Sequence, residues 1–379
     1  MDRIYLDNAA TTPVDPRVIK AMEAYFFGSF GNASSPHRFG QEALKALEDA
    51  RQTIAASIAA KPSEIIFNSG ATEGNNHALF GVARAQKDKG KHIIISSIEH
   101  HSVLEPAECL GRDGYRLTYI GVDAEGRLDP QRIKEALSKD TVLIAVIHAS
   151  NEIGTLQPVA EIGKIARAAG VPFLVDATQT VGHEPVNVKV LNADLLSFSA
   201  HKFYGPKGMG ALYVREKTPL SPYLYGGDQE RSRRASTQNV AGAVGMAEAL
   251  QICIGQMDEE RSSQTAMRDR LLTQLPSLID GVKVNGHPLQ RLANNAHFSF
   301  EGVDGEALLM SLDMAGFAAS MGSACTSGAM EASHVLRSIG LPDELAFGSL
   351  RISLGRFNKE SDIEYLLEKL PEIIRSLRI

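Results

Sequence analysis

Short apolar segments alternate with longer amphipathic ones between residues 64 and 214. The apolar segments are strand-like and fall at residues 65–67, 92–96, 117–120, 142–147, 173–175, 195–198 and 211–214. Between them, and earlier in the chain, apolar residues recur at helical spacing at residues 41–59, 73–87, 129–138 and 159–169. Gly170 is a typical helix stop. The alternation predicts an α/β fold, with helices packed on a mostly parallel sheet of seven strands.

The pattern changes after the glycine pair at residues 226–227. Helical segments there precede a strand-like run, a loop rich in small residues and an amphipathic helix, at residues 295–300, 320–328 and 361–378. We interpret this region as a smaller α+β domain. The predicted organisation is an N-terminal segment that packs with the small domain, a large ligand-binding domain and a small C-terminal domain, at residues 1–15, 16–252 and 253–379.

Composition narrows the classes of partner. The 379 residues carry 39 basic and 45 acidic side chains, a net charge of −6 without long blocks of one sign, so nucleic acid and anionic membranes are not expected as main partners. Three cysteines are too few for a disulfide framework or a zinc site and indicate a reducing compartment. The first residues do not resemble a signal peptide, and no apolar run approaches membrane-spanning length. We expect a cytoplasmic protein that binds a small molecule.

Lys202 follows the strand-like run at residues 195–198. Open α/β sheets bind their ligands at the carboxyl ends of the strands, and the small residues around Lys202 leave room for one. A lysine in this position can form a Schiff base with pyridoxal 5'-phosphate (PLP). A solvated surface lysine is the alternative. The residues at the other strand ends distinguish these interpretations.

The strand at residues 65–67 leads into small residues at the start of a predicted helix. The free N–H groups of the first helical turn suit a phosphate. Ala71 lies at this helix start, and the hydroxyl of Thr72 would add a donor or would only cap the helix. His100 follows the next strand and could stack on an aromatic ring or be structural, while His101 is equally a solvated neighbour.

Two further strand ends carry groups that suit the pyridine ring. Asn151 is a short amide that could donate to the ring hydroxyl oxygen. Asp176 ends a buried strand, where a carboxylate requires a partner, and the protonated pyridine nitrogen is such a partner. Capping of the next helix is the alternative for Asp176. The coincidence of these groups at consecutive strand ends favours a PLP site.

Seven stretches of the chain resemble the cysteine desulfurases of the NifS/IscS type, which belong to the class V aminotransferase group of fold-type I PLP enzymes. They are residues 5–13, 31–37, 69–73, 151–155, 176–179, 199–202 and 350–357, so the match covers essentially the whole chain. The resemblance implies the fold-type I architecture, a homodimer and PLP as cofactor. It also implies roles for the individual residues at the strand ends.

By this resemblance Lys202 carries the cofactor, Asp176 pairs with the pyridine nitrogen and His100, also a catalytic residue, stacks on the ring. Asn151 and Gln179 contact the ring hydroxyl. The phosphate contacts are implied for Ala71, Thr72, Ser199 and His201, and for Thr237 of the second subunit. Two residues depart from the family pattern, because Asp228 and Ser236 stand where glycine is usual, and both bear on the contact that crosses between subunits.

Cys325 lies in a loop almost without bulky side chains, where a thiol is exposed and can carry sulfur to an outside acceptor. Cys109 and Cys253 lie in apolar helical patterns and are expected to be buried and inert. A structural role is the alternative for Cys325. The resemblance makes it the nucleophile and a transient iron–sulfur ligand, with no resident metal, and the long form of its loop fits the NifS/IscS branch better than the selenocysteine-lyase-like one.

Arg351 lies in the strand-like run at residues 349–353, and its guanidinium can bind both oxygens of a substrate α-carboxylate, with help from Asn32. An ion pair with a neighbouring acidic residue is the alternative. The function implied is a cysteine desulfurase that converts L-cysteine to L-alanine and passes a Cys325 persulfide to an iron–sulfur scaffold or tRNA-thiolation partner. An aminotransferase, a selenocysteine lyase and a docking platform with degraded catalysis are the competing hypotheses.

Overall fold

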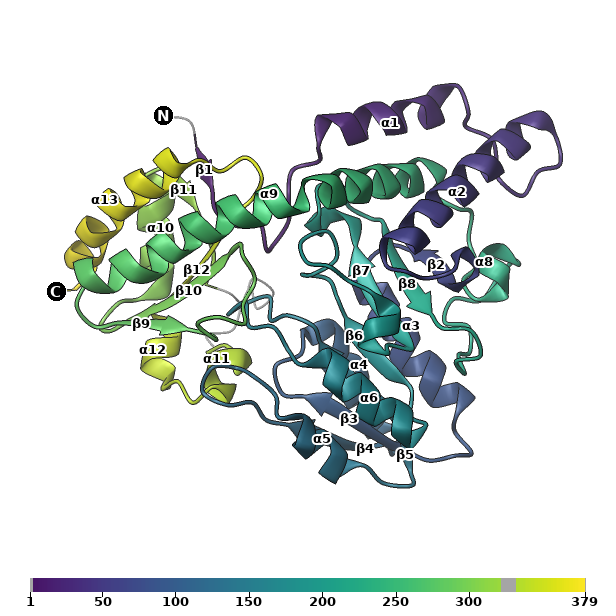
Figure 1. Cartoon of the computed structure of the whole chain (residues 1–379), viewed down its shortest axis with the longest axis horizontal. Helices are drawn as coiled ribbons and strands as arrows, with labels where there is room; N and C mark the ends of the chain where they lie inside the picture. Colours follow the sequence, from purple (N-terminus) through teal and green to yellow (C-terminus); the bar gives the residue numbers. More distant parts are fainter. Residues whose placement is uncertain (1–2, 322–331, 379) are drawn as a thin grey trace.

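A seven-stranded sheet forms the centre of the larger lobe (Figure 1). The computed structural model describes residues 3–321 and 332–378. The sheet has the order β2-β8-β7-β6-β5-β3-β4, and only β8 runs antiparallel to its neighbours. Its strands are β2 (Ile65–Asn68), β3 (His92–Ser96), β4 (Arg116–Ile120), β5 (Thr141–Ile147), β6 (Phe173–Asp176), β7 (Leu195–Ser199) and β8 (Gly210–Val214). The mostly parallel sheet of seven strands is confirmed.

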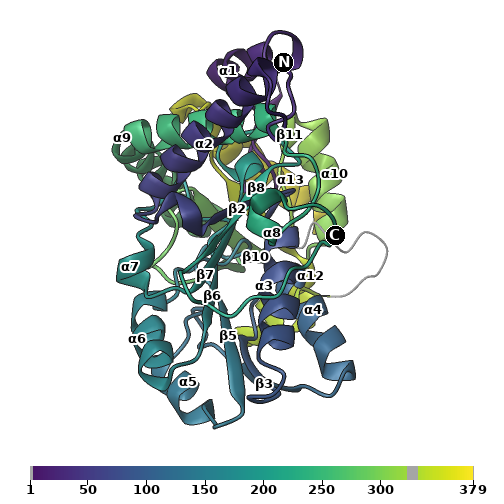
Figure 2. The same cartoon turned by 90° about the vertical axis from the view of Figure 1, so that its right-hand side faces the viewer.

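Helices cover both faces of this sheet, as the edge-on view in Figure 2 shows. One face packs on α2 (Arg38–Ser57), α5 (Pro130–Ala136), α6 (Val159–Ala169) and α7 (Val188–Leu191). The other packs on α3 (Ala71–Ala85) and α4 (His101–Arg112). Neighbouring residues of one strand, such as Ile94 and Ile95, belong to the two different cores. Because both faces are buried, the strands appear in the sequence as continuous apolar runs.

The smaller lobe is built on an antiparallel sheet of β9 (Val282–Asn285), β10 (Asn295–Phe300) and β12 (Ser349–Ser353). Against it pack α10 (Gly305–Met314) and α13 (Glu360–Leu377). The N-terminal strand β1 (Ile4–Tyr5) pairs with β11 (Phe317–Ala318) in this lobe. The remaining elements are α1 (Pro16–Phe27), η1 (Pro62–Glu64), η2 (Ala200–Lys202), α8 (Gln229–Ser232), α11 (His334–Ser338) and α12 (Asp343–Phe347).

One continuous helix, α9 (Val240–Leu278), joins the two lobes. Its first half contributes Met246 and Cys253 to the core of the large lobe, and its second half contributes Leu271 to the core of the small lobe. The domain boundary predicted between residues 252 and 253 therefore falls inside a helix, and the predicted division stays a prediction. The helix is long and apolar enough to cross a membrane, but half of its apolar stretch is buried inside the protein, as in a core helix.

Candidate active site

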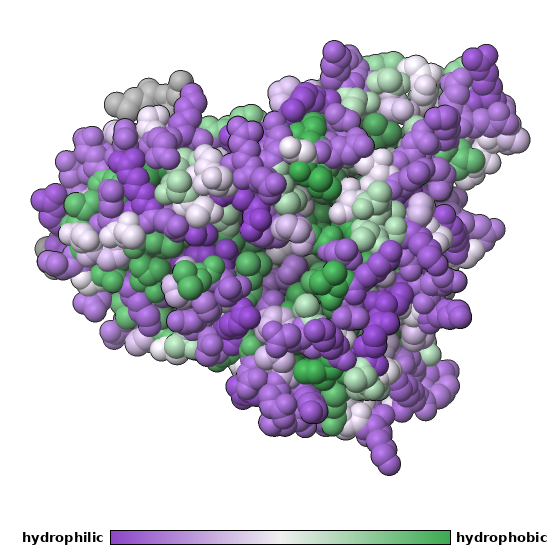
Figure 3. All heavy atoms as spheres, viewed as in Figure 1, coloured by the Kyte–Doolittle hydropathy of each residue, from purple (hydrophilic) through white to green (hydrophobic). Residues whose placement is uncertain are grey.

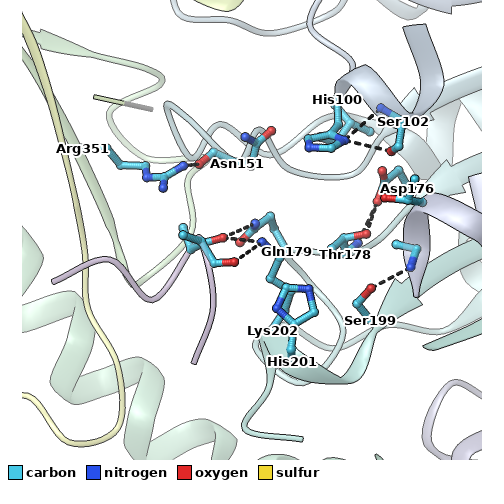
Figure 4. A pocket seen from close by; sticks show the side chains of 15 residues that line it. His100, Ser102, Asn151, Asp176, Thr178, Gln179, Ser199, His201, Lys202 and Arg351 are labelled. Carbon is cyan, nitrogen blue, oxygen red and sulfur yellow. Dashed lines mark hydrogen bonds between the residues drawn. The ribbon is translucent and has the colours of Figure 1, made fainter. Parts of the chain in front are cut away.

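A cavity of about 280 Å³ lies at the carboxyl ends of the central strands (Figure 4). Arg351 lies at one end of it, Asp176 and Ser199 at the other, and Lys202 between them. The cavity brings together most of the predicted site residues, namely Ala71, Thr72, His100, Asn151, Asp176, Gln179, Ser199, His201, Lys202 and Arg351. They come from the carboxyl ends of β2, β3, β5, β6 and β7 in the large lobe, and from β12 in the small lobe.

Lys202 ends the short η2 turn that follows β7. Its Nζ donates to the carbonyl oxygens of Ala9 and Ala10, at 2.6 and 2.8 Å. Its own carbonyl oxygen accepts from Nε2 of His183 at 2.8 Å. The N-terminal segment thus forms a wall of the site, a role that the sequence analysis did not assign. The contact runs through backbone carbonyls, so the alanine side chains gave no signal of it.

Asp176 is the last residue of β6 and is 3% exposed. Its Oδ1 accepts from the backbone N–H and the hydroxyl of Thr178, at 3.0 and 2.5 Å. Its Oδ2 accepts from Nδ2 of Asn75 at 2.8 Å. These donors are all neutral, so a buried carboxylate here still calls for a cation in the cavity. The protonated nitrogen of a pyridine ring fits that requirement. Asp176 does not cap a helix, because turns follow it and the next helix begins at Val188.

His100 is the N-cap of α4, and its ring lines the cavity. Its Nδ1 accepts from the backbone N–H of Ser102 at 3.0 Å and lies 2.9 Å from the Ser102 hydroxyl. Burial lowers the pKa of His100 below its usual value, against the opposing effect of Asp176. His101 lies outside the cavity lining, with Nδ1 3.8 Å from the Glu105 carboxylate. His100 is therefore the histidine that can face a ring.

The end of the cavity predicted to hold a phosphate is formed where α3 begins. Gly70 precedes it with φ +153° and provides no side-chain cap, while the Ala71 N–H donates to Oγ of Ser199 at 2.6 Å. A Cβ at Gly210 would lie 2.5 Å from Cα of Gly70, so only glycine permits this close approach. The helix N-terminus, together with the hydroxyls of Thr72 and Ser199, has the donors that a phosphate needs.

His201 lies beside this end of the cavity, with Nδ1 3.1 Å from the Thr11 hydroxyl. Burial, together with the charges of Lys202 and Lys207, lowers its pKa to about 4. The ring is therefore neutral at neutral pH and can donate a hydrogen bond to an anion. A bound phosphate would oppose this lowering.

Arg351 lies in β12 and is 2% exposed. Its Nη1 donates to the carbonyl oxygen of Asn151 at 2.8 Å, and its Nη2 pairs with Oδ1 of Asp7 at 2.7 Å. The ion pair with an acidic residue is confirmed, and the guanidinium also lines the cavity, while its contact with a substrate carboxylate stays a prediction. This end of the cavity is thus built from the small lobe and the N-terminal segment.

Two predicted residues lie elsewhere in the described structure, and a third is not described. Thr237 is exposed and outside the cavity lining, in a segment that the Arg234–Glu73 ion pair fastens to the start of α3 at 2.8 Å. Asn32 is also exposed and outside the lining, and its Oδ1 accepts from the Ser34 N–H at 2.9 Å. Cys325 lies outside the described residues. The roles predicted for these three residues stay predictions, as do the roles of the residues that line the cavity.

The cysteines in the described part of the chain occupy different settings. Cys253 is buried in α9, as expected, and burial raises its pKa to about 12. Cys109 in α4 is only partly buried, which corrects the expectation that it is fully enclosed. Neither residue lines the cavity.

The class-V aminotransferase family model matches residues 4–366. The chain belongs to this family. A cysteine desulfurase IscS of Dictyoglomus turgidum is 51% identical over 99% of this chain and 95% of its own length. A cysteine desulfurase IscS of Methanosarcina thermophila is 47% identical over 99% of this chain and 93% of its own length. PLP is the cofactor of these class-V enzymes.

Solved structures of class-V enzymes have the same fold. A NifS-like protein has a TM-score of 0.93 and 36% identity, and the match covers 99% of this chain and 100% of the NifS-like chain. A structure described as SspA in complex with cysteine has a TM-score of 0.84 and 35% identity, and the match covers 94% of this chain and 100% of the SspA chain. The resemblance to NifS/IscS enzymes and the fold-type I architecture are confirmed.

Proposed function

We propose that the chain is a PLP-dependent cysteine desulfurase that converts L-cysteine to L-alanine and transfers the sulfur as a persulfide on Cys325. The observation that carries the proposal is the cavity in which Lys202, Asp176 and Arg351 converge. Relatives named cysteine desulfurase match this chain over nearly the full length of both proteins. The site and the relatives therefore support the same activity.

The residues of the cavity would hold PLP in one orientation. Lys202 would bind it covalently, Asp176 would pair with the ring nitrogen and His100 would stack on the ring. Thr72, Ser199, His201 and the start of α3 would hold the phosphate, and Asn151 and Gln179 the ring hydroxyl. When bound, PLP supplies an electron sink that stabilises negative charge on the substrate.

Lys202 would also move a proton. The free lysine amine would lie beside the Ala9 and Ala10 carbonyl oxygens, which would stabilise the ammonium formed when the amine takes up a proton. The free amine is then placed to accept the proton from the substrate Cα. Lys202 thus serves both as the attachment point and as the base.

Arg351 would bind the substrate carboxylate and so present the thiol side of cysteine to the nucleophile. The Cys325 thiolate then attacks the substrate sulfur, forming an S–S bond while the Cβ–S bond breaks. The electron pair of the broken bond remains with the substrate carbon, which takes up protons and leaves as alanine. No external oxidant or reductant is needed for this balance.

A second copy of the chain would complete the site. Thr237 is exposed outside its own cavity and could supply a phosphate contact to a partner. Phe26, Phe27 and Phe30 near the end of α1 are 58, 79 and 64% exposed, a concentration of aromatic surface typical of an interface. Most of the surface in Figure 3 is hydrophilic by comparison. We propose a cytoplasmic homodimer that delivers sulfur to an iron–sulfur scaffold or tRNA-thiolation partner.

The test is to incubate the purified holoenzyme with L-cysteine and to measure alanine, sulfide and the mass of the protein. Wild type should form equal amounts of alanine and transferred sulfur, with the additional sulfur on Cys325. Cys325→Ser should lose desulfuration but still bind L-cysteine, whereas Cys109→Ser should retain activity. Desulfuration at the wild-type rate by Cys325→Ser would favour a lyase without a protein nucleophile, and keto-acid formation would favour an aminotransferase.

A further inference from the structure

Asp176 and His100 are connected by hydrogen bonds that run behind the wall of the cavity. Asn75 of α3, which is completely buried, donates through Nδ2 to Oδ2 of Asp176 at 2.8 Å and to Oγ of Ser102 at 2.9 Å. The Ser102 hydroxyl in turn lies 2.9 Å from Nδ1 of His100 (Figure 4). Asn75 was not singled out by the sequence analysis and does not line the cavity.

The direction of each hydrogen bond follows from the one at Asp176. An ionised carboxylate only accepts, so the nitrogen of the Asn75 amide must face it, and a flipped amide would set two acceptor oxygens against each other. The Ser197 hydroxyl donates to Oδ1 of Asn75 on the other side. Asn75 is therefore fixed in one orientation with all its hydrogen-bonding groups satisfied.

The same argument extends to His100. Nδ1 of His100 accepts from the backbone N–H of Ser102 and so carries no proton, which means that the Ser102 hydroxyl, itself an acceptor from Asn75, donates its hydrogen to Nδ1. The backbone N–H of Ser102 donates to the same nitrogen at 3.0 Å, and a backbone N–H can only donate. Two donors thus face Nδ1, which leaves no room for a proton on it. In a neutral ring the proton must then be on Nε2.

We propose that Asn75 is a positioning residue which directs the Ser102 hydroxyl to Nδ1 of His100 as a second donor beside the backbone N–H, and so keeps the ring neutral with its proton on Nε2. In this state Nε2 can donate a hydrogen bond but cannot act as a base. Proton acceptance from the substrate is left to Lys202. This division of roles between His100 and Lys202 rests on the proposed desulfurase function. The tautomer of His100 itself does not depend on the substrate.

The charges around His100 come from several elements. Asp176 favours the protonated ring, while Lys202, His101 and His334 oppose it, and burial opposes it more than any of them. Without the hydrogen bonds to Nδ1, the ring would still be disfavoured as a cation but could take either neutral tautomer. Burial and the nearby charges therefore keep the ring neutral, and the hydrogen bonds to Nδ1 determine which ring nitrogen carries the proton.

The tautomer can be measured by ¹⁵N NMR of the full-length holoenzyme with ¹⁵N-labelled histidine and no substrate. The chain has 11 histidines, so the His100 signals are identified by their loss in His100→Gln. We expect a protonated Nε2 and an unprotonated, hydrogen-bonded Nδ1 at neutral pH. A proton on Nδ1 would overturn the proposal whether or not the protein desulfurates cysteine.

The part played by Asn75 is tested by titrating His100 in variants. In Asn75→Ala the Ser102 hydroxyl can turn and accept a hydrogen bond from a protonated Nδ1. The cationic ring is then easier to form, so the midpoint of the His100 titration should rise by about one pH unit. Asn76→Ala is the matched control, because Asn76 lies on the same helix and its Nδ2 donates to the Thr72 carbonyl at 2.9 Å. It should leave the midpoint unchanged. An unchanged midpoint in Asn75→Ala would refute the positioning role.

Ser102→Ala keeps the proposal testable if Asn75→Ala does not fold, which circular dichroism would show. This variant retains the backbone N–H to Nδ1, so it should keep the proton on Nε2 while raising the midpoint in the same direction. Adding Asn75→Ala to Ser102→Ala should then cause no further rise, because the hydroxyl that links the two residues is already gone. A full additional rise in the double variant would mean that Asn75 acts on His100 by another route.

Discussion

Arg351 and Asp7 form an ion pair at the wall of the cavity, with 2.7 Å between Nη2 and Oδ1. Asp7 precedes the alanines that hold Lys202 and forms a bridge with Ser353 of β12. The guanidinium is also fixed by the Asn151 carbonyl, 2.8 Å from Nη1. The arginine proposed to bind the substrate carboxylate is thus oriented by the same N-terminal segment that contacts the lysine amine.

We predict that Arg351→Lys raises KM for L-cysteine by about 100-fold and lowers kcat much less, because a single ammonium cannot replace the two-pronged contact with a carboxylate. Steady-state alanine formation over a range of cysteine concentrations measures both constants. Arg375→Lys on the outer helix α13 is the control and should leave both unchanged. A normal KM in Arg351→Lys would move the carboxylate site elsewhere.

Lys202→Ala should abolish turnover while leaving the protein folded. The change removes the covalent attachment and the base, but the hydrogen bonds lost inside the protein are those to the Ala9 and Ala10 carbonyls. Alanine formation at saturating added PLP is the measurement, with thermal unfolding as the test of folding. Lys207→Ala changes an exposed lysine of the same loop and should remain active. Substantial activity of Lys202→Ala would remove the lysine from the mechanism.

Much of the fold could be predicted from the sequence because the sheet is buried on both faces. Each run of consecutive apolar residues became a strand, and the helix at Val159–Ala169 begins and ends where its spacing and Gly170 predict. The carboxyl-end rule then identified Asp176, His100 and Lys202. Local pattern was sufficient for these features.

Features that depend on tertiary contacts could not be predicted in this way. The helix α9 passes through both cores without a break in its pattern, so no sequence signal marks a domain boundary. Ala9 and Ala10 act through backbone carbonyls, and Asn75 is polar on a helix face that only the packed structure buries. Thr178 could have been suggested by its place two residues after Asp176.

Ser236→Gly should stabilise the protein. Ser236 stands where the family usually has glycine, and its φ of +99° lies in the left-handed region that costs a side chain about 1 kcal/mol or more. Glycine adopts this conformation without that cost, so we expect the free energy of unfolding to rise by about 1 kcal/mol. Urea denaturation measures it. Ser232 is also left-handed, at φ +60°, and Ser232→Gly should act in the same direction.

Asp228 provides the matched control for these serines. It too stands where glycine is usual, but its φ is −84°, which any residue adopts. Asp228→Gly should therefore not stabilise the protein and should lose some stability through the greater freedom of glycine in the unfolded chain. Equal gains from Ser236→Gly and Asp228→Gly would show that backbone strain is not the cause.

Glu99 should make stability depend on pH. The side chain is 1% exposed, its Oε1 accepts from the Ser96 hydroxyl and from the Ile147 N–H at 2.7 Å, and within the described residues its Oε2 has no hydrogen-bond partner. Burial raises the pKa of Glu99 from 4.5 to about 8. The folded protein therefore keeps a proton on Glu99 over a pH range in which the unfolded chain has lost it.

Folding then requires proton uptake between about pH 4.5 and pH 8, so stability falls as the pH rises through this range, by at most about 1.4 kcal/mol per unit. Glu99→Gln resembles the protonated side chain and needs no proton. We predict that its free energy of unfolding, relative to wild type, increases from pH 5 to pH 8 in denaturation experiments. Glu108→Gln, an exposed residue of α4, should show a constant difference. A constant difference for Glu99→Gln as well would mean that Glu99 is ionised in the folded protein.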